Sequence, residues 1–311
     1  MSSPLSGQTV LITGGAGFIG SHLADVLHRT NDVRVLDDLT SGTRSNLPSG
    51  VTLIEGSILD EDIVEKATED VDVIFHEAAI VDVGASVEQP FQTHEVNCDG
   101  GLSILDRARD EDARVVVASS AAVYGQPTRV PITEDDPLRP TSPYGLQKLA
   151  LDRYTTLYHD LYGVETVALR YFNVYGRRGE QSQYSGVIDT FVRRALDGDP
   201  LVIFGDGTQT RDFVHVDDVV QANLLAATTS NVGGSYNVAT GECITIRELA
   251  ETIVELTEST SPIQFEPAQP GDIDESEADI SRAQHSLGFE PTMSLRTGLE
   301  RLVDERTERY A

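Results

Sequence analysis

A tyrosine and a lysine one helical turn apart are the residues of this chain best suited to acid–base chemistry. The 311 residues include 21 arginines but only two lysines, and one of these, Lys148, lies four positions after Tyr144. If a helix begins after Pro143, the ammonium and the phenol share one face. A phenolate base near neutral pH needs the tyrosine pKa lowered by roughly 3 units, or about 4 kcal/mol. The alternative is a surface tyrosine and lysine with no joint role.

Two serines add hydroxyl groups at a predicted strand end. Ser119 and Ser120 follow the apolar run Arg114–Val117. Ligands of open α/β sheets bind beyond the carboxyl ends of the strands. A serine there can hydrogen-bond a substrate oxygen while the charge on that oxygen changes.

Six short apolar runs alternate with amphipathic segments and predict the scaffold for these side chains. The alternation indicates an α/β fold, a doubly wound parallel Rossmann sheet with both faces covered. The pattern weakens after Gly176, so we expect a dinucleotide-binding Rossmann domain over residues 1–176 and a smaller C-terminal substrate-binding α/β lobe over 177–311, with segments that can interleave. The runs are Thr9–Ile12, Val33–Leu36, Val51–Ile54, Val71–Phe75, Arg114–Val117 and Thr166–Leu169.

A glycine-rich segment directly follows the first predicted strand. Gly14, Gly17 and Gly20 permit a tight turn, close approach of the backbone to a pyrophosphate, and close packing of helix on strand. The second strand ends at Asp37, 17 residues past Gly20, where a carboxylate can accept hydrogen bonds from an adenosine ribose. Since an acid repels a 2′-phosphate, NAD is expected rather than NADP, with Asp38 as the alternative ribose contact. The competing interpretation is an ordinary glycine-rich turn and a solvated aspartate.

Four motifs occur in one order along nearly the whole chain: TGGAGFIGSHL, SSAAVYG, SPYGLQK and RYFNVYG. Together they resemble the extended short-chain dehydrogenase/reductases, most closely nucleotide-sugar 4-epimerases of the UDP-glucose 4-epimerase type. The resemblance implies that Tyr144 is the general base, that Lys148 and the cationic nicotinamide lower its pKa, and that Ser120 orients the sugar C4 oxygen. Hydride would pass from C4 to NAD⁺ and return to the other face of a 4-keto sugar.

The resemblance also implies two sets of binding residues. The set for NAD comprises Gly14, Gly17, Phe18, Ile19, Gly20, Asp37, Asp38, Leu39, Ser57, Ile58, Ala78, Ala79, Ile80, Asn97, Ser119, Tyr144, Lys148 and Tyr171. The set for a UDP-sugar or another nucleotide-sugar substrate comprises Ser86, Ser120, Tyr144, Asn173, Val187, Phe204, Arg211, Asp272 and Ser276.

Several substrate assignments have a competing interpretation. Asn173 and Arg211 match residues that contact the diphosphate, but Arg211 could instead pair with Asp212 or Asp217. Val187 and Phe204 match contacts around a uracil, although ordinary core packing accounts equally well for both.

One position bears on the choice of sugar. In the family, a tyrosine at the position of Ser276 restricts the pocket to plain hexoses, and a small residue admits N-acetylated ones. A solvated turn residue is the competing interpretation. The chain departs from the family at Gln269, where many relatives have arginine, and at Ser57, which replaces an acid of the adenine loop.

The segment after Ser120 bears on which reaction the protein catalyses. Sister 4,6-dehydratases and decarboxylases carry an acidic residue there, whereas this chain has Ala121 and Ala122, which favours epimerisation. A 4,6-dehydratase or a 4-keto-sugar reductase is the alternative. A nonenzymatic NAD-sensing module of the same fold would usually lack the tyrosine and lysine pair.

Composition excludes several classes of partner. A formal charge of −28 argues against nucleic-acid binding and against docking on an anionic membrane.

The first residues lack the features of a signal peptide, and two cysteines, Cys98 and Cys243, fit a reducing cytosol, so a cytoplasmic protein is expected. The seven histidines show no ligand spacing, so His215 is interpreted as structural and no metal is expected. By analogy with relatives, a homodimer would form through residues 93–110 and 144–161.

The acidic excess and the scarcity of lysine, typical of proteins from salt-loving organisms, predict that stability and activity increase with salt. In molar salt the Debye length falls to about 3 Å, which screens repulsion among the acidic groups. Melting curves and rates in dilute buffer and in about 2 M potassium chloride measure the effect. Full activity and an unchanged melting temperature in dilute buffer would contradict it.

Overall fold

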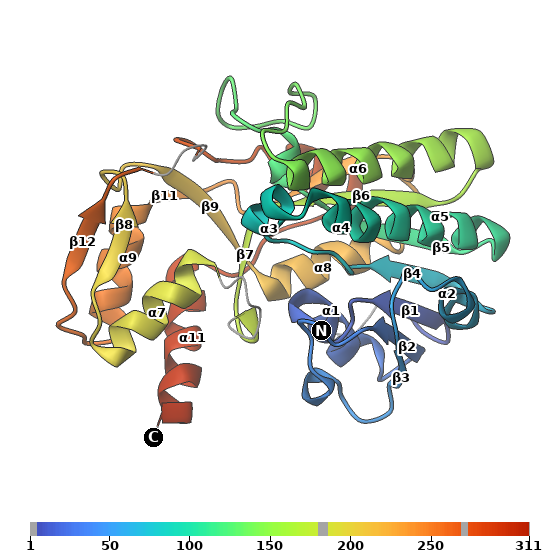
Figure 1. The fold of residues 1–311 in the computed structure, drawn as a ribbon, viewed down its shortest axis with the longest axis horizontal. Coiled ribbons are helices and arrows are strands. Elements are labelled where there is room, and N and C mark those ends of the chain that lie inside the picture. Colours follow the sequence, from blue (N-terminus) through green and yellow to red (C-terminus); the bar gives the residue numbers. More distant parts are fainter. Residues whose placement is uncertain (1–4, 180–185, 269–272, 311) are drawn as a thin grey trace.

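The computed structural model describes residues 5–179, 186–268 and 273–310, and a seven-stranded parallel sheet lies at its centre (Figure 1). The strand order β10-β6-β5-β4-β1-β2-β3 reverses between β1 and β4, which creates the crevice where doubly wound sheets bind ligands. All six predicted strands are present, so the predicted fold class is confirmed. The strands are β1 (Thr9–Thr13), β2 (Asp32–Asp37), β3 (Thr52–Glu55), β4 (Val73–His76), β5 (Arg114–Ser120), β6 (Thr166–Tyr171) and β10 (Ser235–Val238).

Helices cover both faces of this sheet, because its strands are apolar on both sides. Adjacent residues of β1 show this alternation: Val10 and Ile12 belong to one core, and Leu11 belongs to the other. The first core lies under α1 (Phe18–Leu27), α8 (Val216–Ala226) and α10 (Ser281–Leu287). The second lies under α2 (Glu61–Thr68), α5 (Gly101–Asp110) and α6 (Pro143–Tyr162).

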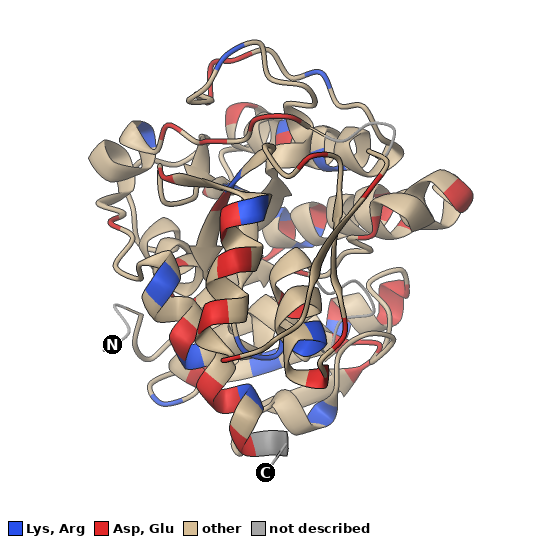
Figure 2. Cartoon of the chain, turned by 90° about the vertical axis from the view of Figure 1, so that its left-hand side faces the viewer, with Lys and Arg blue, Asp and Glu red and all other residues tan. Residues whose placement is uncertain are grey.

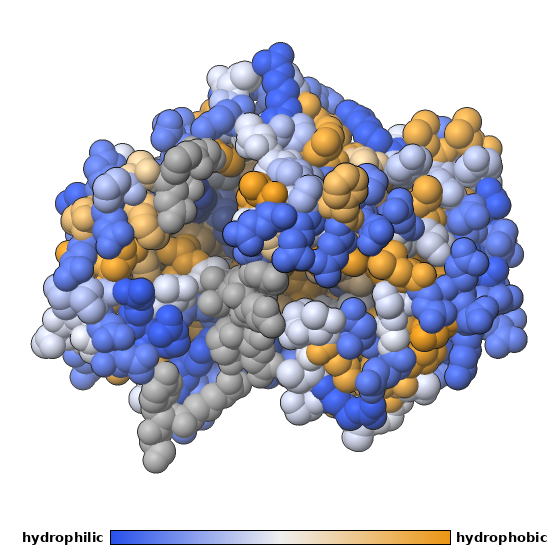
Figure 3. All heavy atoms as spheres, viewed as in Figure 1, coloured by the Kyte–Doolittle hydropathy of each residue, from blue (hydrophilic) through white to orange (hydrophobic). Residues whose placement is uncertain are grey.

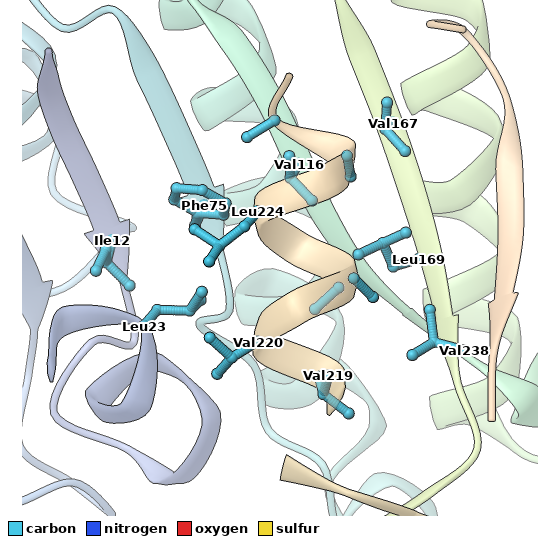
Figure 4. Packing of buried hydrophobic residues seen from close by; sticks show 14 of the residues in the cluster. Ile12, Leu23, Phe75, Val116, Val167, Leu169, Val219, Val220, Leu224 and Val238 are labelled. Carbon is cyan, nitrogen blue, oxygen red and sulfur yellow. The ribbon is translucent and has the colours of Figure 1, made fainter. Parts of the chain in front are cut away.

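Helix α8 occupies the middle of the first core (Figure 4). Its Val220 and Leu224 point toward Leu23 of α1 and toward Phe75 and Val116 of the sheet. All five side chains are at most 4% exposed. A segment that follows residue 176 in sequence therefore completes the apolar centre of the large sheet.

The chain thus passes between its two parts more than once. Strand β10 pairs with β6 in parallel, from Ser235 opposite Ala168 to Val238 opposite Tyr171. Strand β7 lies in the smaller lobe, whereas α8, β10 and α10, which follow it in sequence, return to the large sheet.

A smaller lobe carries its own apolar core beside the sheet. It contains a three-stranded sheet in the order β11-β9-β7 and a parallel pair of β12 and β8, packed with three helices. The elements are β7 (Asn173–Tyr175), α7 (Val187–Asp197), β8 (Leu201–Phe204), β9 (Thr210–His215), β11 (Cys243–Thr245), α9 (Ile246–Leu256), β12 (Ile263–Glu266) and α11 (Leu295–Tyr310).

Short helical segments link β4 to β5. They are α3 (Val83–Glu88), α4 (Pro90–His94) and a π-helical turn over Glu95–Gly100 that continues into α5. Single 3₁₀ turns occupy Arg44–Asn46 and Ala121–Val123. Within the described ranges, no helix combines the length and the apolar character that a membrane crossing requires.

Acidic residues are spread over the surface of the fold. Figure 2 shows them along several helices, with fewer basic residues between them. The charge imbalance is thus distributed over the helices in view and does not form one isolated patch.

Candidate active site

Helix α6 begins where the sequence predicted, and local hydrogen bonds fix its first turn. The Ser142 hydroxyl caps the helix by accepting from the Gly145 N–H at 3.1 Å, and Pro143 takes the first helical position, where no N–H is needed. The Tyr144 N–H donates to the Ser86 hydroxyl at 3.1 Å. Tyr144 and Lys148 are 9% and 3% exposed and line the same cavity, so they share one face of the helix, as the spacing predicted.

The phenol of Tyr144 meets the hydroxyl of Ser120 at the carboxyl end of β5. Ser120 accepts from the Ala122 N–H at 3.1 Å and hydrogen-bonds the Tyr144 side chain. Burial raises the pKa of Tyr144, and the Ser120 hydrogen bond lowers it. The larger downward shift that a phenolate base needs would come from the charges of Lys148 and nicotinamide, and it stays a prediction.

Lys148 extends along the same helix face beneath the strand ends. Its Nζ donates to the Ala118 carbonyl oxygen at 2.8 Å. Burial lowers the pKa of Lys148 to about 8, while the Glu77 carboxylate raises it. The ammonium is therefore anchored to β5, one helical turn from the phenol.

These three side chains line one cavity of about 630 Å³ beyond the strand ends, a volume typical of cofactor pockets. The cavity brings together most of the predicted NAD set. Its lining includes Gly14, Gly17, Phe18, Ile19, Gly20, Asp37, Asp38, Ser57, Ile58, Ala78, Ala79, Ile80, Ser119, Ser120, Tyr144, Lys148 and Tyr171.

The glycine-rich turn fits a dinucleotide pyrophosphate. A Cβ on Gly14 would lie 2.7 Å from the Ala78 nitrogen, and one on Gly20 would lie 2.5 Å from the Gly14 oxygen, so both positions exclude side chains. Gly17 precedes α1, and no side chain caps this helix. The backbone N–H groups at the start of α1 therefore suit a phosphate. The residues present fit NAD.

Asp37 and Asp38 both line the cavity, and each also holds the local backbone. Asp37 accepts from the N–H groups of Ala16 at 2.9 Å and Leu39 at 2.8 Å. Burial raises the pKa of Asp37, although these two hydrogen bonds lower it. Asp38 accepts from the Thr40 N–H at 2.9 Å. Leu39 itself adopts a φ of 58° and is not one of the described residues that line the cavity.

Two predicted contact residues act behind the cavity wall. Asn97, in the π-helical turn, bonds the backbone of Ile80 in both directions, at 2.8 and 2.9 Å, and so shapes the loop after β4. Ser86 is fully buried, donates to the Val83 carbonyl oxygen at 2.6 Å and accepts from Tyr144. Both therefore position lining residues.

Three of the predicted substrate residues, Asn173, Arg211 and Ser276, lie at or next to β9 in the smaller lobe. Asn173 donates to the Asp212 carbonyl oxygen at 2.9 Å, and Arg211 donates to the Thr210 and Ile273 carbonyl oxygens. Ser276 is buried, and its N–H lies 3.4 Å from the Thr210 hydroxyl.

The remaining predicted substrate residues lie apart from that group. Val187 begins α7 next to Gly186, which lines the cavity, and Phe204 ends β8 with 37% of its surface exposed. Asp272 and Gln269 lie outside the described residues.

Two carboxylates in or next to the site were not predicted from the sequence. Glu77 follows β4 directly, lines the cavity and accepts a hydrogen bond from the Tyr171 hydroxyl at 2.9 Å. Asp152 is fully buried one turn after Lys148 and accepts from Ser119 at 2.7 Å. An acid immediately after a buried strand was the available signal for Glu77, whereas nothing local marked Asp152.

Histidines and acids of the described residues form no cluster of three or more that could hold a metal ion. His215 packs its ring edge-on against Tyr175 and caps α8 by accepting from the Asp217 N–H at 3.2 Å. Both contacts of His215 hold the fold together.

The doubly wound sheet and the cavity beside the glycine-rich turn define a dinucleotide-binding protein of the Rossmann type. The model of the NAD dependent epimerase/dehydratase family matches residues 10–239, and the chain belongs to that family. Membership confirms the predicted resemblance and NAD as the coenzyme.

Known relatives are similar over nearly the full chain. A putative UDP-glucose 4-epimerase of Methanocaldococcus jannaschii is 40% identical over 299 residues, covering 95% of this chain and 97% of that protein. A UDP-N-acetyl-alpha-D-glucosaminuronate decarboxylase of Bacillus cytotoxicus is 36% identical, covering 94% of this chain and 96% of that protein. Among solved structures, the UDP-N-acetylglucosamine 4-epimerase of Methanobrevibacter ruminantium, in complex with UDP-N-acetylmuramic acid, has a TM-score of 0.94 at 37% identity, covering 98% of this chain and 100% of that one.

Proposed function

We propose that the protein interconverts the C4 epimers of a UDP-sugar, with UDP-glucose and UDP-galactose as the first pair. The observation that carries the proposal is the hydrogen-bonded pair of Tyr144 and Ser120, with Lys148 one helical turn away in the same cavity. This arrangement offers a base, a hydroxyl that holds an oxygen and a fixed cation at the place where a nicotinamide would lie.

Each of the three side chains has a separate task in this reaction. Tyr144 takes the proton of the C4 hydroxyl and returns it after the sugar has turned over within the site. Ser120 holds the C4 oxygen as it changes between hydroxyl and ketone. Lys148 stabilises the phenolate by its charge. NAD supplies the acceptor and the donor of the hydride and is unchanged after a full cycle.

Epimerisation is favoured over dehydration by the residues that follow Ser120. Dehydration needs an additional acid or base at C5 or C6 of the sugar. Ala121 and Ala122 occupy the 3₁₀ turn next to the base, and the Ala122 N–H is bonded to Ser120. Neither side chain can exchange a proton.

Incubation with UDP-galactose followed by separation of the sugars tests the activity. We expect UDP-glucose to form without net change in NAD, and we expect Tyr144→Phe to lower the rate by about 10²- to 10⁴-fold while NAD stays bound. Tyr162→Phe is the matched control, because this tyrosine lies on the same helix and is 52% exposed. A normal rate in Tyr144→Phe contradicts the assigned base, and a dehydrated sugar or stoichiometric NADH consumption supports the rival activities.

We extend the proposal to UDP-N-acetylhexosamines. Ser276 is small, buried and close to Thr210 on β9, next to the group of predicted substrate residues. A small side chain there leaves room for an acetamido group, whereas a tyrosine would fill that room.

The range of sugars is measured with UDP-galactose, UDP-N-acetylglucosamine and UDP-N-acetylgalactosamine as substrates. The wild-type enzyme should accept all three, and Ser276→Tyr should lower kcat/KM at least about tenfold for the two N-acetylated sugars only. Retained turnover of UDP-galactose shows that the variant is folded. Rejection of both N-acetylated sugars by the wild-type enzyme contradicts this extension.

We also propose that the protein is a homodimer that acts in the cytosol. The free thiols Cys98 and Cys243 fit a reducing compartment. Apolar side chains on α6 and on the packed helices α3 and α4 are exposed to an unusual degree (Figure 3). They are Val87 (62%), Phe91 (85%), Leu146 (59%), Tyr154 (39%), Leu157 (45%) and Leu161 (66%). The face thus includes the predicted stretch 144–161 and residues just before the predicted stretch 93–110.

Light scattering after gel filtration tests the dimer. The wild-type protein should elute at twice the chain mass of 33.7 kDa, and Phe91→Glu combined with Leu161→Glu should elute as a monomer. Phe265→Glu is the control, since Phe265 is 47% exposed but lies on β12 of the smaller lobe. A wild-type monomer contradicts the proposal.

A further inference from the structure

The charge of Lys148 requires a counter-charge within the protein. The residue is 3% exposed, and its one hydrogen bond goes to a neutral carbonyl, that of Ala118. None of the described carboxylates lies within contact distance of its ammonium. A buried ammonium without a compensating negative charge tends to lose its proton. The family chemistry needs the opposite, because only a charged lysine stabilises a phenolate.

Glu77 is the carboxylate placed to supply that charge. It follows β4 directly, and its N–H donates to the Thr13 carbonyl oxygen at 3.1 Å, which extends the sheet by one residue. Its side chain lines the same cavity as Lys148. The position is half-buried, so the charge acts through a partly apolar medium where Coulomb interactions are stronger than in water.

A chain of hydrogen bonds fixes the Glu77 side chain. The Asn223 amide nitrogen donates to the Val219 carbonyl oxygen at 2.9 Å and to the Tyr171 oxygen at 2.8 Å. Because the amide can only donate there, the Tyr171 hydroxyl proton points to the Glu77 oxygen, 2.9 Å away. Helix α8 thus orients Glu77 through β6.

We propose that Glu77 is a positioning residue of the active site: its carboxylate, held by Tyr171, is the counter-charge that keeps Lys148 protonated. The inference rests on the proposed function for its catalytic meaning, but the charge of Lys148 exists without substrate. Its effect is electrostatic and passes through the cavity without direct contact.

The charged and titratable groups around the pair agree with this assignment. Burial raises the pKa of Glu77 to about 7, while the Tyr171 hydrogen bond and Lys148 lower it. Lys148 also faces His76, whose pKa burial lowers to about 3, and Cys98, whose pKa burial raises to about 11. Near pH 8, where Lys148 titrates, both are uncharged and most of Glu77 is ionised. The buried Asp152 carboxylate, one turn after Lys148, is paired with Arg170, which leaves Glu77 as the source of uncompensated negative charge.

The scarcity of lysine makes a direct measurement possible. Protein grown with lysine carrying ¹³C at Cε has two labelled residues, buried Lys148 and exposed Lys66, so an NMR titration follows both together. Glu77→Gln removes the charge and keeps an oxygen that can accept from Tyr171. We expect the Lys148 midpoint to fall by about one pH unit, with Lys66 unchanged.

A matched control separates a local effect from the change in net charge. Asp99→Asn removes one negative charge from the turn that carries Cys98, but its side chain is 64% exposed and is screened by solvent. The titration midpoint of Lys148 in Asp99→Asn should equal that in the wild-type protein. An unchanged midpoint in Glu77→Gln, or an equal shift in Asp99→Asn, overturns the proposal.

A second variant keeps the test decisive if Glu77→Gln does not fold. Tyr171→Phe removes the hydroxyl that lowers the Glu77 pKa, so less Glu77 is ionised at neutral pH and the Lys148 midpoint should fall by a smaller amount. No shift in this variant contradicts the assigned hydrogen-bond chain.

The kinetic consequence has a defined sign. Because Lys148 must be protonated, kcat/KM is lost as pH rises through its pKa, and Glu77→Gln should move this alkaline limb to lower pH by about one unit. If the titration shifts while no epimerase activity exists in any variant, the electrostatic pair stands and the proposed function fails.

Discussion

The buried ion pair of Asp152 and Arg170 holds helix α6 on the sheet. Asp152 accepts from two Arg170 nitrogens at 3.0 and 2.9 Å, and from Ser119 and Ser235. One carboxylate of α6 thereby joins β5, β6 and β10. Removing one partner of such a pair typically costs about 3 to 5 kcal/mol, because the other charge is left buried and uncompensated. The register of Tyr144 against Ser120 depends on this contact.

Charge is used differently inside the protein and on its surface. Over the whole chain acidic residues exceed basic ones by 28. On the surface, ion pairs such as those of Arg296 with Glu255 and Glu300 join exposed side chains and contribute little to stability. Inside, some buried charges are paired, such as Asp189 with Arg306 at 2.7 Å, and others are held by backbone N–H groups, such as Asp37. The cavity differs, since Lys148 and Glu77 both line it and no ion pair joins them.

The sequence predicted those features of the structure that depend on residues close together in the chain. The six apolar runs became strands, Pro143 began the catalytic helix, and Gly14, Gly17 and Gly20 lined the cavity. Strand β10 was not predicted, because four residues that contain a serine and an asparagine lack a clear apolar pattern. The supporting roles of Ser86 and Asn97 could not be predicted from the sequence either. Ser86 bonds a residue 58 positions away, and Asn97 bonds one 17 positions away.

The return of β10 and α8 to the central sheet has a consequence for biosynthesis. As the chain leaves the ribosome, the first 176 residues emerge with one apolar side of the sheet covered only in part, by α1, since Val220 and Leu224 of α8 follow later. The edge of β6 likewise lacks its neighbour until residue 238 has been made. The nascent chain therefore exposes a sheet edge and an apolar face for the time that about 60 further residues take, several seconds at ordinary translation speed. In that interval the unfinished chain is most prone to pair with another chain through the open sheet edge.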